Sequence, residues 1–151
     1  MKRFRFSLRP VAILRAHREQ RAREQFAAAV HAFVAAEEEL QRTRTRMQAL
    51  ESALFTGRQN GFRAAEAASL LADYRHECAG EVEAERTSIA AREEMERRRT
   101  AYLEAHRNLE VVERLEEKAR GVHYREMLRH EQAEFDEFAG HRRLKPASLS
   151  V

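Results

Sequence analysis

The sequence is poor in the residues that build compact cores or stabilise secreted domains. Its 151 residues include no tryptophan, 7% aromatic residues, five glycines, two prolines and one cysteine. Because Cys78 stands alone, no internal disulfide can form, which favours a reducing, cytoplasmic location. No apolar stretch follows the charged residues 1–6, and no apolar run is long enough to span a membrane. These shortages argue against a secreted, membrane-spanning or ordinary globular protein.

Charge and helix-forming residues are abundant instead. Charged residues make up 35% of the chain, and 28 basic and 25 acidic residues are interspersed, giving a net charge of only +3. Such a mixture is typical of helix faces laced with ion pairs. A richness in Ala, Glu, Leu and Arg is typical of long helices and coiled coils. The balanced charge also weakens the case for nucleic-acid binding.

A heptad repeat occupies the first half of the chain. Large apolar residues recur every seven positions, at Phe26, Phe33, Leu40, Met47 and Leu54, and Ala29, Ala36, Thr43 and Leu50 fill the +3 positions. This spacing lies along one side of a helix, which we expect over residues 10–55, and needs a partner helix to bury it. Because Glu19 interrupts the repeat, we expect a change of register before Phe26.

The partner helix is expected over residues 63–139. Gly57, Asn60 and Gly61 predict a turn over residues 56–62, and Gly80 marks a possible break in the second helix. The candidate buried positions of this helix are Tyr74, Cys78, Val82, Ile89, Met95, Tyr102, Leu103, Leu109, Val112, Leu115, Ala119 and Val122. At 1.5 Å per residue the arms would measure about 68 Å and about 115 Å.

The predicted fold is therefore all-α, an elongated two-helix antiparallel coiled-coil hairpin with unequal arms. It forms one domain over residues 1–145, and residues 146–151 are expected to be a flexible tail. The longer arm should overhang at the end that carries both termini.

Motifs for catalysis or metal binding are missing. There is no P-loop and no GxGxxG, and a two-helix hairpin offers almost no concave site. No base is placed to activate Cys78 as a nucleophile, so we expect Cys78 to be a small residue of the seam. His123, His130, Glu126 and Glu131 read as a solvated face rather than a metal site. We expect no enzyme activity, no catalytic residues, no metal and no cofactor.

Two aromatic clusters lie near the chain ends. Phe4, Phe6 and Leu8 precede the heptads, and Phe135 and Phe138 lie in an otherwise charged helix end. Exposed aromatics of this kind indicate a docking surface. Alternatively, Phe4 and Phe6 pack on Phe135 and Phe138 and close the hairpin, and the two interpretations are compatible.

The same clusters resemble the FliJ family, the small coiled-coil component of the flagellar type III export apparatus. The matching stretches are Phe4-Arg5-Phe6-Ser7-Leu8 with Pro10-Val11, Glu113 to Lys118, Tyr124-Arg125-Glu126, and His130 to Ala139. The turn at residues 57–61 also lies where the family has its hairpin tip. His130, Ala133 and Glu134 depart from the lysines common in the family's C-terminal run.

The resemblance implies a non-enzymatic stalk that enters the hexameric ring of the FliI-like export ATPase. It also implies contacts with the FlhA-like export gate and with substrate export chaperones, no nucleic acid, and a cytoplasmic location peripheral to the inner membrane through these partners. The expected ATPase-facing residues are Phe4, Phe6, Leu8, Leu115, Tyr124, Gln132, Phe135, Asp136 and Phe138. The gate-facing part would lie nearer the turn, over residues 50–74.

Other classes of function stay open at this point. They are the coiled coil of a virulence-type secretion system, a nucleic-acid-associated coiled coil, a zipper-type homodimer of straight helices, and an enzyme. Nucleic-acid binding should fall steeply with salt. A zipper would make the seam over residues 26–54 intermolecular.

Overall fold

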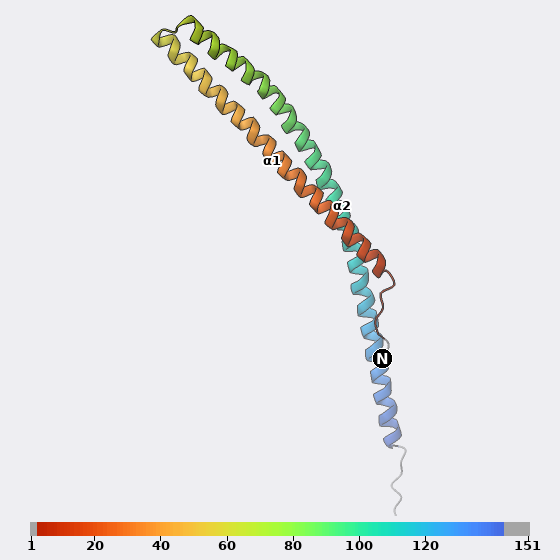
Figure 1. Cartoon of the computed structure of the whole chain (residues 1–151). Helices are drawn as coiled ribbons and strands as arrows, with labels where there is room; N and C mark the ends of the chain where they lie inside the picture. Colours follow the sequence, from red (N-terminus) through yellow and green to blue (C-terminus); the bar gives the residue numbers. More distant parts are fainter. Residues whose placement is uncertain (1–2, 144–151) are drawn as a thin grey trace, which may run out of the picture. The chain divides into compact units, whose positions relative to one another are not determined.

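Two long helices form nearly all of the described structure. The computed structural model describes residues 3–143, and this range contains α1 (Arg9–Asn60), α2 (Ala64–Arg143) and no strand (Figure 1). The two helices pack against each other, so the prediction of an all-α helical hairpin is confirmed. The tail expected at residues 146–151 lies outside the described residues.

The contacts divide the chain into two compact units, which are described separately. The turn unit is Arg18–Ala105, and the terminal unit combines Met1–His17 with His106–Val151. The turn unit contains the connection between the helices. The terminal unit contains the start of α1 and nearly half of α2, from His106 onward.

Buried positions in α1 follow an unbroken 3-4 spacing. The positions of reduced exposure on this seam are Ala12, Arg15, Glu19, Ala22, Phe26, Ala29, Phe33, Ala36, Leu40, Thr43, Met47, Leu50, Leu54 and Gly57. The expected register change before Phe26 is therefore wrong. Glu19 lies in the seam at 4% exposure, and its carboxylate accepts a 2.7 Å hydrogen bond from Arg23. A charged residue can occupy a seam position when a neighbouring cation compensates its burial.

The α2 seam is also regular, but small and polar residues form much of it. Its positions are Ala67, Leu70, Tyr74, Glu77, Glu81, Ala84, Ser88, Ala91, Met95, Arg98, Tyr102, Ala105, Leu109, Val112, Glu116, Ala119 and His123. The predicted burial of Val82, Ile89, Leu103, Leu115 and Val122 is wrong, since these side chains are 40–54% exposed. The buried face of α2 cannot be assigned from its largest apolar residues, because alanine in α2 fits opposite bulky side chains of α1.

Polar contacts across the turn unit show that the helices run antiparallel. As residue numbers rise along α1 they fall along α2, through the pairs Gln25–Arg98, Arg44–Glu81, Arg46–Glu77 and Glu51–Tyr74. The distances between the paired atoms are 2.8–3.1 Å. The rings of Phe26 and Tyr102 stack with centroids 6.0 Å apart. These contacts fix the register of one helix against the other.

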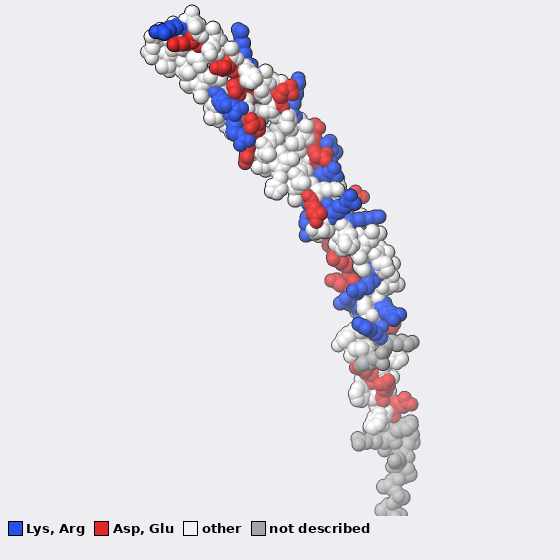
Figure 2. Space-filling view, in the orientation of Figure 1, with Lys and Arg blue, Asp and Glu red and all other residues white. Residues whose placement is uncertain are grey.

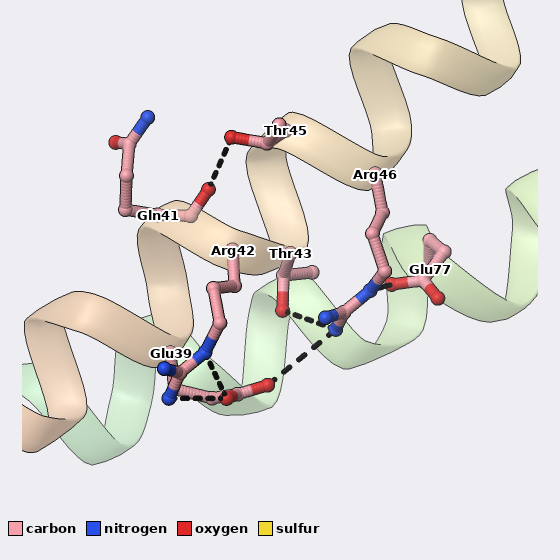
Figure 3. Close-up of polar contacts among 7 residues, drawn as sticks. All are labelled: Glu39, Gln41, Arg42, Thr43, Thr45, Arg46 and Glu77. Carbon is pink, nitrogen blue, oxygen red and sulfur yellow. Dashed lines mark hydrogen bonds and ion pairs between the residues drawn. The ribbon is translucent and has the colours of Figure 1, made fainter.

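Arg46 makes several of the polar contacts in this register. Its Nε donates to Glu77 of α2 at 3.1 Å, and its terminal nitrogen donates to the Thr43 hydroxyl at 3.0 Å and to Glu39 at 3.4 Å (Figure 3). The same Glu39 also accepts from Arg42 at 3.0 Å. One guanidinium therefore joins both helices.

The turn is shorter than the expected residues 56–62, because α1 continues to Asn60 and α2 begins at Ala64. Gly61 has a φ of 80°, the left-handed conformation that ends helices at glycine. The Phe62 ring lies on Gly57, where an added Cβ would fall 1.7 Å from a ring carbon. That pairing of positions matches the apolar contact of a Schellman motif. Gly57 is thus a packing position inside α1 and not a helix breaker.

The second helix is continuous where a break was considered. It passes through Gly80 and extends to Arg143, beyond the expected end at residue 139. A Cβ built at Gly80 would meet no atom within 4 Å. The helix propensity of the neighbouring residues and the packing of the seam therefore outweigh the free-energy cost of a glycine at this position.

Candidate docking surfaces

The N-terminal segment of the terminal unit lies against α2. The Phe4 ring meets the His123 ring edge-on with centroids 5.5 Å apart, and the Arg120 guanidinium lies 5.8 Å from the Phe4 centroid. The backbone N–H of Arg9 donates to the carbonyl of Phe6 at 3.2 Å, just before α1 begins. Both Phe4 and Phe6 are half-buried, whereas Leu8 is exposed. The segment is held where the α2 seam ends.

Phe4 does not close the hairpin by packing on the C-terminal aromatic residues. It contacts His123, twelve residues before Phe135, a separation of about 18 Å along a helix. Phe135 is 71% exposed and Phe138 is 69% exposed. The expected convergence of Phe4 with these two side chains is therefore wrong. Burying two exposed rings on a helix end needs a partner surface.

The other expected ATPase-facing residues are exposed along α2. Leu115 and Tyr124 keep 43% and 57% of their surface, and the Gln132 amide donates to Asp136 at 3.1 Å. The structure thus brings Tyr124, Gln132, Phe135, Asp136 and Phe138 together on one length of helix. Leu128, at 44% exposure, belongs to the same length and was not predicted.

The end of this helix is acidic. Residues 131–138 include Glu131, Glu134, Asp136 and Glu137 and no basic residue, in a chain whose net charge is +3. Acidic side chains gather near this end of α2 in the space-filling view (Figure 2). Aromatic rings among carboxylates form a surface that suits a basic and apolar partner.

A second exposed apolar stripe lies in the turn unit. Leu71, Val82 and Ile89 of α2 are 40%, 49% and 54% exposed, and half-buried Cys78 falls between them. Spacings of seven and four place these residues on one side of the helix. Phe55 of α1 is 65% exposed. Sequence reasoning missed this stripe because it assigned Val82 and Ile89 to the seam.

Titratable groups in the turn unit form hydrogen bonds both between the helices and within α1. The hydrogen bond to the Glu51 carboxylate raises the pKa of Tyr74 to about 12. Hydrogen bonds from Arg42 and Arg46 lower the pKa of Glu39. Among residues 3–143, no cluster of three or more His, Cys, Asp and Glu side chains is arranged to hold a metal ion. In the same range, neither helix has a stretch apolar and long enough to cross a membrane.

Comparison with known families decides the identity of the chain. The model of the family described as Flagellar FliJ protein matches residues 4–148. The chain belongs to the FliJ family. The match includes both terminal clusters and the turn, and it assigns the protein a role related to flagellar export. Comparisons with curated proteins and with solved structures gave no match.

Proposed function

We propose that this FliJ-family protein is a non-enzymatic stalk of the flagellar type III export apparatus. It binds the hexameric FliI-like export ATPase with the end of α2 and couples the ring to the FlhA-like gate and to substrate chaperones. It acts in the cytoplasm and reaches the membrane through these partners. The observation that carries the proposal is the exposed pair Phe135 and Phe138 on a helix end of a FliJ-family chain.

Burial of these rings would supply the binding energy at the ATPase. Full burial of a phenylalanine side chain is worth about 1.5–3 kcal/mol. Charged side chains around the rings permit repeated contact with several ring subunits without a permanent dry interface. A stalk that exchanges partners within a ring needs such a surface.

The gate would bind the stripe of Leu71, Val82 and Ile89 in the turn unit. Leu71 lies within the gate-facing range of residues 50–74 that the family resemblance implies, and Val82 and Ile89 extend the proposed surface further along α2. The stripe is apolar, exposed and outside the seam that pairs the helices. Its occupation would therefore leave the hairpin intact.

The ATPase assignment is tested by pull-down and ATP turnover with the purified export ATPase of the same flagellar system. The parent protein should bind and change turnover. The double variant Phe135→Ala with Phe138→Ala should bind at least tenfold more weakly, while its helicity by circular dichroism stays unchanged. Phe55→Ala is the matched control, because it removes a ring that is 65% exposed in the turn unit.

Two results would contradict this proposal. Absence of any binding or turnover change by the parent protein would remove the stalk assignment. Equal loss of helicity and binding in the double variant would mean that the two rings stabilise the helix end. A triple alanine variant at Leu71, Val82 and Ile89 should weaken gate binding and leave ATPase binding unchanged.

A further inference from the structure

The seam that pairs α2 with its partner segment ends at His123. Its 3-4 spacing runs through Val112, Glu116, Ala119 and His123. Continued in the same register it would reach Glu126, His130, Ala133 and Glu137, which are all exposed and contain no large apolar side chain. Between residues 124 and 140 only Met127 and Glu131 are half-buried, so the 3-4 register of the hairpin seam is not kept toward the end of α2.

A second heptad stripe starts one residue later. Tyr124, Leu128, Glu131, Phe135 and Phe138 follow at spacings of 4, 3, 4 and 3. A shift of one residue turns the stripe by about 100° around the helix. The apolar side chains on it are 44–71% exposed. This face differs from the one that pairs the two helices of the hairpin. Its aromatic residues therefore do not continue the hairpin seam.

We propose that residues 124–138 are a separate docking helix, which lies with this stripe along a basic α-helical surface of the export ATPase. The inference rests on the proposed function and adds to it the binding face, the register and the charge of the partner. Heptad spacing is the pattern by which one helix buries its apolar residues against another. Fourteen steps of 1.5 Å give the contact a length of about 21 Å.

The charge of the segment selects the chemistry of its partner. Within residues 124–138 two arginines stand against five carboxylates, which gives a net charge of −3. Two copies of this segment would repel each other, so a second copy of the chain is disfavoured as the occupant. Glu131 lies in the stripe, one turn from Leu128 and Phe135, and Glu134 lies one turn before Phe138. A partner with lysine or arginine beside its apolar groove pairs with these carboxylates.

Charge reversal with a matched control tests the predicted partner. The double variant Glu131→Lys with Glu134→Lys should bind the purified ATPase at least tenfold more weakly than the parent. Its affinity should also depend less on salt between low and physiological ionic strength. The control, Glu113→Lys with Glu117→Lys, makes the same change of net charge on the same helix at exposed positions outside the stripe, and should bind within twofold of the parent.

A second pair of variants tests the face. Leu128→Glu puts a carboxylate on the stripe, whereas Ala133→Glu puts one on the continuation of the hairpin register. Leu128→Glu should weaken ATPase binding at least tenfold, and Ala133→Glu should have less than a threefold effect. Circular dichroism should give the same helicity for both variants.

The outcomes separate this inference from the proposed function. If the parent binds the ATPase but the stripe and control variants bind equally well, the docking helix is overturned and the stalk function stands. If the parent does not bind, the stalk function fails and the docking helix fails with it. If sedimentation shows a parent dimer that Leu128→Glu dissociates, the occupant is a second copy and the basic partner is refuted.

Discussion

Glycines in this chain act in different ways according to what lies beside them. Gly57 supports the Phe62 ring at the turn, whereas Gly80 faces open space in the middle of α2. The same glycine-to-alanine change is therefore expected to stabilise the protein less at Gly57 than at Gly80. Sequence position alone did not distinguish them, because both look like helix breakers.

We predict that Gly80→Ala stabilises the protein by about 1 kcal/mol, the difference in helix propensity between the two residues. Gly57→Ala should raise the melting temperature less than Gly80→Ala, because the new Cβ overlaps the Phe62 ring and displaces it, which offsets the same gain in helix propensity. Thermal unfolding followed at 222 nm compares the two variants. An equal rise in melting temperature for both would show that Phe62 does not depend on Gly57.

Tyr74 links helix pairing to alkaline pH. Its folded pKa of about 12 lies above the ordinary value of 10.0, because the hydroxyl donates to Glu51 across the helices. The stabilising contribution is therefore complete below pH 10 and is lost as the pH rises toward 12. We predict that Glu51→Gln lowers the pKa of Tyr74 toward 10. Tyrosinate absorbance in a Tyr102→Phe, Tyr124→Phe background measures it, and an unchanged titration would contradict the assigned cause.

At the scale of the helices, the sequence indicated α1 better than α2. Phe26, Leu40 and Leu54 mark the α1 seam because large side chains occupy it at a fixed interval. In α2, alanine, serine and glutamate occupy much of the seam, and Val82 and Ile89 lie outside it. Hydrophobicity alone predicts the wrong buried face in such a helix, since the partner helix decides which face is buried.

The observed buried face of α2 leads to a prediction about helix stability. Leu40→Ala should destabilise the protein by about 2–3 kcal/mol, because Leu40 is 6% exposed and its removal leaves a cavity in the seam. Ile89→Ala should change stability by less than about 0.5 kcal/mol, because the side chain is 54% exposed. Urea unfolding of the two variants measures both values. A larger loss of stability for Ile89→Ala than for Leu40→Ala would support the original prediction that Ile89 is buried in the seam.

At the scale of the whole molecule, function depends on residues that the fold does not use. The seam explains Leu40 and Val112 through burial, and it leaves Leu71, Tyr124 and Phe135 exposed. Sequence reasoning found the aromatic end because phenylalanine is rare in a charged helix. It did not find the change of face at Tyr124, because that depends on where the partner segment stops, which no local pattern records.

The three-residue connection at Gly61 affects the equilibrium of helix pairing. It makes the pairing of α1 with α2 an intramolecular event, and a short connection gives an effective concentration on the order of millimolar. A seam rich in alanine, glutamate and serine can therefore stay paired although it buries few large side chains. If a protease cut the chain beside Phe62, pairing would become bimolecular, and the two halves would separate once diluted below the dissociation constant of their complex. The turn thus makes the pairing of the two helices independent of the protein concentration.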